Sequence, residues 1–153
     1  MATETLRHPG GGGRVVQFSV FVANKLGRLH DLSALLKQHH VHILALTVLD
    51  TTDSAIVRAV VDDPERARDL FHEHGFAFTE SPVLVVEVDI ETRLEAVLKA
   101  MLEAEINIHH VYAFLALPDG RPLIALNVED QDLAAEALRR HRFNVLTQAD
   151  LLR

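Results

Sequence analysis

Apolar and polar positions along the chain change their period several times, and each change marks a predicted element. Residues Val15 to Ala23 alternate and are rich in valine and phenylalanine, which predicts a strand with one buried face. The segment Asn24-Lys25-Leu26-Gly27 then predicts a tight turn. Between Arg28 and His40, leucines recur at every third or fourth position, which predicts an amphipathic helix. These leucines are Leu29, Leu32, Leu35 and Leu36.

Two further strands and a second helix follow. Val41 to Thr51 and Ala55 to Val61 are β-rich runs on either side of a polar turn, so they predict a hairpin. Asp62-Asp63-Pro64 predicts a helix start, with an acidic cap before a proline at the first helical position, and Gly75 predicts its C-cap. Phe76 to Glu80 predicts a short fourth strand, and the order of elements is βαββαβ.

The same order recurs in the second half of the chain. Val83 to Val88 repeats the first strand, and Arg93 follows Arg28 by 65 residues. After a longer hairpin at Pro118-Asp119-Gly120 the offset becomes 67. A repeat with one small insertion at a hairpin predicts two similar domains, at residues 14–81 and 82–153. Residues 1–13, which end in four glycines, are expected to form a disordered tail.

Each βαββαβ unit is expected to fold as a split βαβ sandwich, a four-stranded antiparallel sheet with two helices on one face. The predicted fold class is therefore α+β, with two ferredoxin-like units. Units of about 70 residues bury only a modest core, so we expect the two units to pack side by side and the chain to form a homodimer. Tyr112 and Phe114 are expected to line the sheet face between the units or a subunit contact, or else a pocket wall.

The first turn and the helix ends resemble the ACT domain, a small regulatory module of amino-acid metabolism. The usual family pattern is a strand, then N-x-P-G-x-L, then a helix that ends in G-[IV]-N-I. The first copy matches it at Asn24, Gly27 and Leu29 but has Leu26 where proline is usual. The second copy matches at Ala104-Glu105-Ile106-Asn107-Ile108, whereas its turn, Asp89 to Leu94, has neither the proline nor the glycine. The resemblance covers about residues 14 to 153 and implies a free-standing tandem ACT protein.

The resemblance also implies a ligand site. In ACT domains, a ligand sits where the turn after the first strand meets a neighbouring domain, and the Asn of G-[IV]-N-I reaches it across the interface. His42 occupies this Asn position in the first copy, and Asp89 occupies the position of Asn24 in the second. The ligand-binding residues implied are Asn24, Leu26, Gly27, Arg28, Leu29, His42, Asp89 and Asn107.

The chemistry of the first turn is consistent with a small carboxylate ligand. Gly27 permits a positive φ or a close approach of the backbone to the ligand, and the free amides after it can hold a carboxylate. A side-chain amide such as Asn107, or the carboxylate of Asp89, suits an α-ammonium group. The second turn is a poorer anion site because Asp89 and Glu91 repel a carboxylate, so we expect asymmetric occupancy. The simpler alternative is that Gly27 is only a turn residue and Asn24 only a cap.

Charge and composition exclude several classes of partner. The net charge is −7 and no segment concentrates lysine or arginine, which argues against a nucleic-acid partner. The chain has no cysteine, so it has no disulfide, thiol nucleophile or thiolate metal site. It has no apolar leader segment, and no apolar run approaches the about 18 residues that cross a bilayer. We therefore expect a cytoplasmic protein with no membrane partner.

The ten histidines invite a metal site, but their predicted placement argues against one. His39, His40 and His42 follow the first helix, and His72 and His74 end the second; in a split βαβ unit these ends point to opposite ends of the sheet. We therefore expect the two clusters not to converge, and we expect no metal site and no cofactor. Adjacent helical residues such as His30 and Asp31 point about 100° apart and do not form a natural acid–base pair, so we expect no catalytic residue.

The sequence thus predicts a non-catalytic regulatory or sensor protein. It would bind an amino acid or a similar small carboxylate at the interface between ACT units, and pass its occupancy to a regulated enzyme or to its own assembly state. The alternative is a structural or interaction dimer without a small-molecule ligand. The missing proline at Leu26 and the missing glycine of the second turn favour that alternative.

Overall fold

The computed structural model describes residues 13–23, 26–88 and 93–151. Both halves contain the predicted βαββαβ order, and the fold is α+β. The strands are β1 (Val15–Ala23), β2 (Ile43–Asp50), β3 (Ser54–Val61), β4 (Ala77–Glu87), β5 (Ile108–Ala113), β6 (Leu123–Val128) and β7 (Val145–Leu146). The helices are α1 (Arg28–Gln38), α2 (Pro64–Glu73), α3 (Arg93–Glu103), α4 (Gln131–Arg140) and α5 (Gln148–Leu151), with a 3-10 turn at Pro118–Gly120.

Local sequence signals account for the starts of the helices. The side chain of Asp63 accepts a hydrogen bond from the backbone N–H of Arg66, at 3.1 Å, and Pro64 stands at the first position of α2. Asp130 caps α4 in the same way, accepting from the N–H of Leu133 at 3.0 Å. The two copies therefore start their second helices with the same device.

All seven strands belong to one sheet, and β4 is common to both halves. The strand order is β2-β3-β1-β4-β6-β5, with β7 also paired to β4. The first part of β4 pairs with β1, up to Val83 opposite Val15, and its last part pairs with β6, beginning with Leu84 opposite Leu126. We call β1–β3 with α1, α2 and the first part of β4 the first unit, and the remainder the second unit.

The sequence predicts two separate strands on either side of Ser81-Pro82, whereas β4 runs through both residues. Pro82 interrupts no ladder of backbone hydrogen bonds with β6, because that pairing begins only at Leu84. The Pro82 carbonyl instead accepts from the side chain of Asn127, at 3.3 Å. The division of the chain at residue 81 stays a prediction.

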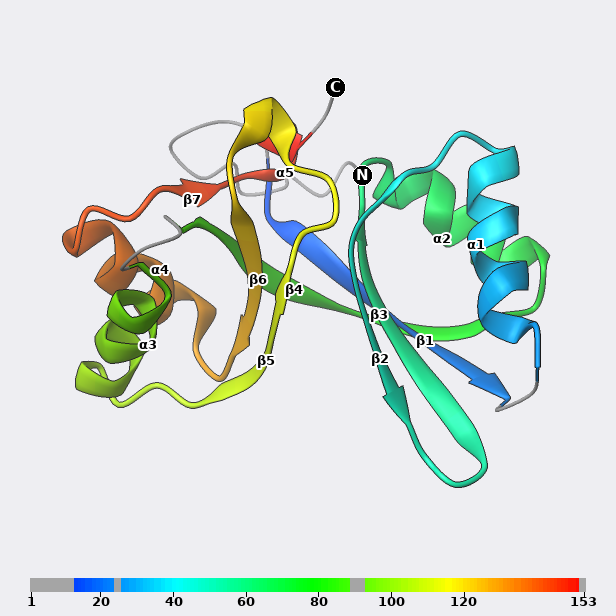
Figure 1. Ribbon diagram of the computed structural model, residues 1–153, viewed down its shortest axis with the longest axis horizontal. Helices are drawn as coiled ribbons and strands as arrows, with labels where there is room; N and C mark the ends of the chain where they lie inside the picture. Colours follow the sequence, from blue (N-terminus) through cyan, green and yellow to red (C-terminus); the bar gives the residue numbers. More distant parts are fainter. Residues whose placement is uncertain (1–12, 24–25, 89–92, 152–153) are drawn as a thin grey trace, which may run out of the picture.

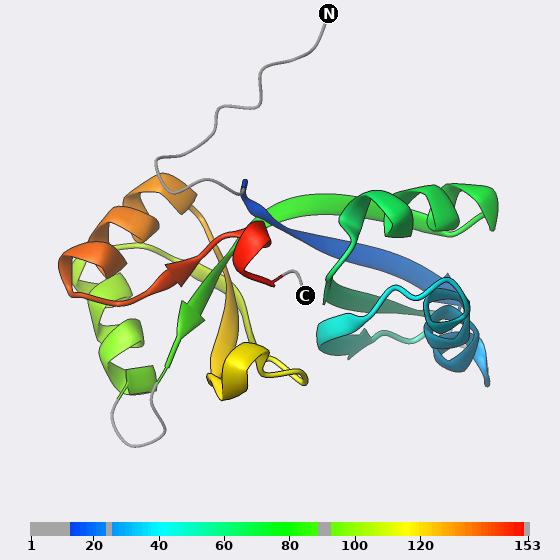
Figure 2. The same cartoon turned by 90° about the horizontal axis from the view of Figure 1, so that it is seen from above.

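The helices α1 to α4 lie at the two outer ends of the molecule, with most of the strands between them, whereas the short α5 lies near the middle (Figures 1 and 2). In the first unit, α1 and α2 pack on one face of the sheet over a core that includes Phe18, Leu36 and Phe71. In the second unit, α3 and α4 cover a core that includes Met101 and Leu138. The two long helices of each unit therefore lie on one face of its strands, as the sequence predicts.

A third core fills the space between the helix-free faces of the two units, and we call this contact the seam. The sheet curls until β2 meets β5: Ala45 forms a bridge with Phe114, and the N–H of Leu115 donates to the Leu44 carbonyl at 2.7 Å. The prediction that Tyr112 and Phe114 line the sheet face between the units is confirmed. The seam core comprises Val15, Leu44, Ala45, Val60, Val83, Val85, Tyr112, Phe114, Leu123, Ala125, Leu146 and Leu151.

Every helix in the described part of the chain is too short or too polar to span a bilayer.

Candidate functional site

The predicted ligand turn forms as a left-handed glycine at the head of α1. Gly27 is the N-cap residue, with φ 89° and ψ −9°, and its carbonyl accepts from the N–H of Asp31 at 2.8 Å. Because the N-cap residue is a glycine, it has no side chain of its own to accept from the first amides of the helix. A Cβ at Gly27 would meet no atom within 4 Å, and Leu26 is fully exposed.

Arg28 and Leu29 flank this turn. The Arg28 guanidinium carbon lies 5.0 Å from the centroid of the Phe76 ring and one guanidinium nitrogen lies 3.7 Å from an Asp31 carboxylate oxygen, so the side chain is held beside the helix start. Leu29 is 42% exposed. Asn24 and Asp89 lie outside the described residues.

His42 lies at the opposite end of α1. Its N–H donates to one Asp62 carboxylate oxygen at 2.8 Å, and its Nδ1 lies 2.6 Å from the other. His42 lines a cavity of about 480 Å³ together with Lys37, His40 and, from the second unit, Ala116. This cavity lies at the contact between the units.

Asn107 is the structural counterpart of His42 in the second unit. The Asn107 carbonyl accepts from the N–H of Glu129 at 3.0 Å, just as the His42 carbonyl accepts from that of Asp62 at 3.1 Å. Asn107 is exposed. The repeat therefore places these two residues at equivalent strand starts.

Within one chain, the predicted residues do not form a single pocket. Leu26 to Leu29 are contiguous, but α1 has 11 residues and is about 16 Å long, so His42 is separated from Gly27 by the length of the helix. The Gly27 turn also lies at the outer end of β1, away from the second unit (Figure 1). A site that joins the turn to a neighbouring unit therefore requires a second chain.

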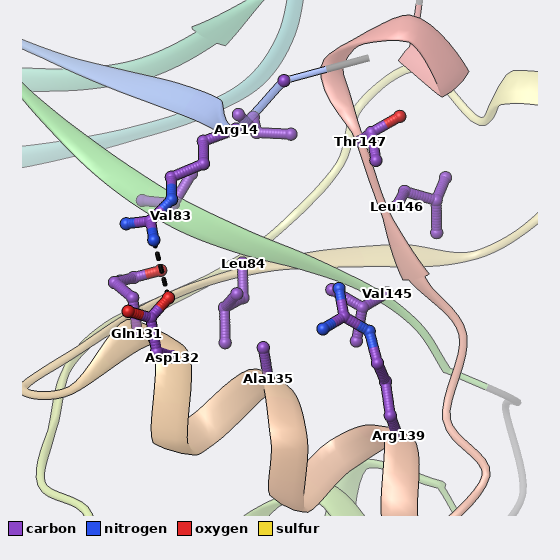
Figure 3. Close-up of a pocket in the computed structure, with 12 residues that line it drawn as sticks. Arg14, Val83, Leu84, Gln131, Asp132, Ala135, Arg139, Val145, Leu146 and Thr147 are labelled. Carbon is purple, nitrogen blue, oxygen red and sulfur yellow. Dashed lines mark hydrogen bonds and ion pairs between the residues drawn. The ribbon is translucent and has the colours of Figure 1, made fainter. Parts of the chain in front are cut away.

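A second cavity, of about 300 Å³, lies beside α4 and includes no predicted ligand residue (Figure 3). Leu84 and Val145 contribute apolar surface, and Arg139 and the Arg14–Asp132 ion pair, at 2.6 Å, add charge. The sequence did not reveal this cavity. Asp132 and Arg139 lie on an ordinary polar helix face, and Arg14 directly follows the predicted tail.

Polar side chains also meet inside the seam, which sequence analysis did not foresee. Gln17 is 1% exposed, and Tyr112 Oη donates to Gln17 Oε1 at 2.7 Å. Burial raises the pKa of the Tyr112 phenol, while the charge of Arg58 lowers it. One signal was present in the sequence: Gln17 is a polar residue inside an otherwise apolar strand.

The histidine clusters approach each other more closely than expected. The rings of His39 and His74 have centroids 6.5 Å apart, so the prediction that the two clusters do not converge is wrong for this pair. The reason is that α1 and α2 cross steeply instead of lying antiparallel (Figure 2). In the described part of the chain, no three histidine or acidic side chains gather as a metal site would require.

Comparison with known proteins places the chain in a family. The family model for an ACT domain pair matches residues 14–153. The chain belongs to the family of ACT domain pairs. His42 and Asn107 are thus equivalent positions of two ACT units, and the Gly27 turn is the turn after the first strand of the first unit.

Solved structures of low sequence identity share the ACT-pair fold. Protein BT0572 from Bacteroides thetaiotaomicron is 23% identical, with a TM-score of 0.83 over 93% of this chain and 98% of that chain. The regulatory subunit of aspartate kinase from Thermus thermophilus is 13% identical, with a TM-score of 0.57 over 83% of this chain and 91% of that chain. The corresponding subunit from Thermus flavus is 12% identical, with a TM-score of 0.54 over 85% and 93%. The comparison with curated proteins finds no match.

Proposed function

We propose that this ACT domain pair is a non-catalytic regulatory protein that binds an amino acid or a similar small carboxylate at an interface between ACT units. The observation that carries the proposal is the left-handed Gly27 at the head of α1, where an added Cβ would meet no atom within 4 Å. Family membership supports it, as does the fold shared with two proteins named as regulatory subunits of aspartate kinase.

The amides of the first turn of α1 hold the ligand carboxylate in this proposal, because they have no intrahelical partners and lie at the positive end of the helix dipole. Leu26 and Leu29 supply exposed apolar surface for the ligand side chain. Asn24, or Asn107 of a neighbouring unit, takes the α-ammonium group. Since the second turn has Asp89 and no glycine, the Gly27 turn is the better-occupied site.

The neighbouring unit comes from a second copy of the chain, which makes the protein a homodimer. Leu94, Leu98 and Leu102 recur every fourth residue on α3 and are 48%, 38% and 76% exposed, so they form an apolar stripe on the outer surface of the helix. A stripe of this kind on a soluble protein marks an association surface. The partner that responds to ligand binding is a regulated enzyme, and we place the protein in the cytoplasm.

The alternative function is a structural or interaction dimer with no small-molecule ligand. Leu26 favours it, because this residue replaces the usual proline of the turn and is fully exposed. In that case the leucine stripe on α3 would serve assembly alone.

A thermal-shift screen of the common amino acids and short carboxylates tests the proposal. A ligand at 100 times its Kd adds about 2.7 kcal/mol of stability, which raises Tm by several degrees in a chain of this size. The Gly27→Val variant is expected to lose the response, because a β-branched residue is strained at positive φ and its side chain covers the amides.

Gly120→Val is the matched control. Gly120 also has a positive φ, 71°, and open space around it, and it lies in the β5–β6 connection of the second unit, so the substitution introduces similar strain away from α1. It is expected to lower Tm and to keep the ligand response. The absence of any shift in the wild type would favour the alternative, and an equal response of both variants would contradict the site.

A further inference from the structure

The seam between the two units changes from apolar to polar at one end. There, Gln17 Nε2 donates to Ser81 Oγ at 3.4 Å, and Asn127 Nδ2 donates to the same oxygen, also at 3.4 Å. Tyr112 Oη donates to the Gln17 amide oxygen. Four side chains from both units therefore form a hydrogen-bonded group on the helix-free faces, and Gln17, Tyr112 and Asn127 in it are at most 9% exposed.

Arg58 lies beside this group and has an unsatisfied buried nitrogen. It stands on β3 directly opposite Ser19, which shares the helix-free face of β1 with Gln17. The buried Nε of Arg58 has no hydrogen-bond partner. In the part of the chain that the structure describes, the arginine ion pairs belong to Arg14, Arg28, Arg68, Arg121 and Arg140. None of these ion pairs of the described residues involves Arg58.

His110 approaches the same place from the second unit. His110 lies on β5, opposite Asn127 of β6, and shares the helix-free face of β5 with Tyr112. Its buried Nδ1 also has no hydrogen-bond partner. Burial lowers the pKa of His110, and the charge of Arg58 lowers it further. The charge of Arg58 also lowers the pKa of the Tyr112 phenol, so Arg58 lies near both His110 and Tyr112.

The Arg58 Nε and the His110 Nδ1 are both buried without a partner, on parts of the curled sheet that face each other. This is unusual, because nearly all buried polar groups in folded proteins have a hydrogen-bond partner. The Nε of Arg58 is the costlier of the two, because it belongs to a charged group and a buried donor of that kind needs a hydrogen-bond partner. A planar carboxylate matches the guanidinium fork, and a neutral or charged imidazole can donate to its second oxygen.

Residues of the first unit beside this group are only partly buried. The strand register places Thr47, Arg58, Ser19 and Thr79 in one row across β2, β3, β1 and β4. Thr47, Arg58 and Ser19 are partly buried and Thr79 is exposed, so solvent reaches part of this row.

We propose that the seam binds a small carboxylate between Arg58 of the first unit and His110 of the second, at a site separate from the Gly27 turn. The ligand would connect the two units directly and so stabilise their mutual packing, giving the domain pair a second point at which a metabolite acts. This site stands whether or not the Gly27 turn binds an amino acid.

The test compares the Tm of the full chain in sodium acetate and in sodium chloride at equal ionic strength and fixed pH. Acetate in about tenfold excess over its Kd is expected to raise the wild-type Tm by about 2–6 °C. Arg58→Met is expected to lose this response and, in chloride, to match or exceed the wild-type Tm, because it removes a buried nitrogen that has no hydrogen-bond partner and leaves an apolar chain in its place.

Arg139→Met is the matched control, since it removes the same charge from an exposed arginine beside the α4 cavity. It is expected to keep the acetate response. Loss of the response in Arg139→Met would place the anion in that cavity and overturn the proposal, as would a wild type that responds to sulfate and not to acetate. No acetate response at all would mean that water alone satisfies these nitrogens, which also overturns it.

Titration of the histidine ring signals by NMR gives a second, site-specific measurement. Acetate neutralises the charge of Arg58, so the pKa of His110 is expected to rise. Arg58, His109 and Tyr112 are the charged or titratable groups around His110, and Asn127 is its hydrogen-bonding neighbour. An unchanged His110 pKa in saturating acetate contradicts the site. Gly27→Val is expected to retain the acetate response, which separates this proposal from the proposed function.

Discussion

The first helices of the two units, α1 and α3, occupy equivalent positions and present different surfaces. Their buried faces correspond, with Leu36 in α1 and Met101 in α3 at 1% and 0% exposure. Their outer faces differ: at the three equivalent outward positions, α1 has a leucine, a serine and a lysine, whereas α3 has three exposed leucines. These positions are Leu29, Ser33 and Lys37 in α1, and Leu94, Leu98 and Leu102 in α3.

The turns that precede these two helices also differ. The turn before α1 has Gly27, whereas the equivalent position before α3 is Thr92. The copy that retains the ligand turn therefore has a polar helix surface, and the copy that lost the glycine has an apolar one. We interpret this as a division of labour, in which the first unit binds the ligand and the second unit provides the assembly surface.

The strongest test of the shared architecture is a matched pair of core truncations. Leu36→Ala and Met101→Ala are each expected to lower the free energy of unfolding by about 2–5 kcal/mol, because both remove a fully buried side chain from equivalent cores. Urea denaturation followed by circular dichroism measures this. A loss below about 1 kcal/mol for either variant would show that the two cores are not equivalent.

A matched pair on the outer faces tests the division of labour. Leu98→Lys is expected to weaken the dimer by about 2 kcal/mol or more, roughly 30-fold or more in its dissociation constant, because it places a charge in the middle of the apolar stripe. Ser33→Lys, at the equivalent position of α1, is expected to leave the dimer unchanged. Sedimentation velocity over a concentration series measures both, and a dimer that tolerates Leu98→Lys but not Ser33→Lys would reverse the assignment.

The smallest expected effect is the pH dependence of stability that His110 causes. It arises in the second unit alone, because the position equivalent to His110 in the first unit is Ala45. The folded-state pKa of His110 is below its ordinary value of 6.5, so the unfolded chain binds the proton more readily. Its contribution to stability is therefore present above about pH 6.5 and is lost as the pH falls through the folded-state pKa.

His110→Gln is accordingly expected to flatten the fall of Tm between pH 7 and pH 5, whereas His30→Gln, at an exposed position, leaves it unchanged. A series of melts in buffers of matched ionic strength measures this. An equal flattening by both substitutions would show that the acid sensitivity has another source.

Much of the fold could be predicted from local patterns. The alternation in β1 gave its bounds at Val15 and Ala23, and the Asp63-Pro64 signal gave the start of α2. The repeat offset identified equivalent positions such as His42 and Asn107, which make equivalent backbone hydrogen bonds. These features depend on neighbours along the chain, and the sequence contains that information directly.

The features that were missed depend on contacts between distant segments. Ser81-Pro82 resembles a break, and only the position of β6 shows that Pro82 interrupts no ladder. Arg58 and His110 resemble ordinary solvent-facing residues until the sheet curls and brings their faces together. The crossing of α1 and α2, which brings His39 to His74, likewise depends on helix packing.

The central claim is that the Gly27 turn is the working ligand site and its counterpart before α3 is not. Native mass spectrometry of the dimer, titrated with the amino acid that gives the largest thermal shift, measures this directly. In the Arg58→Met background, which removes the seam site, we expect two ligands per dimer, one per chain, with binding lost on adding Gly27→Val and kept on adding Gly120→Val. Four ligands per dimer in that background, or binding that survives Gly27→Val there, would contradict the account.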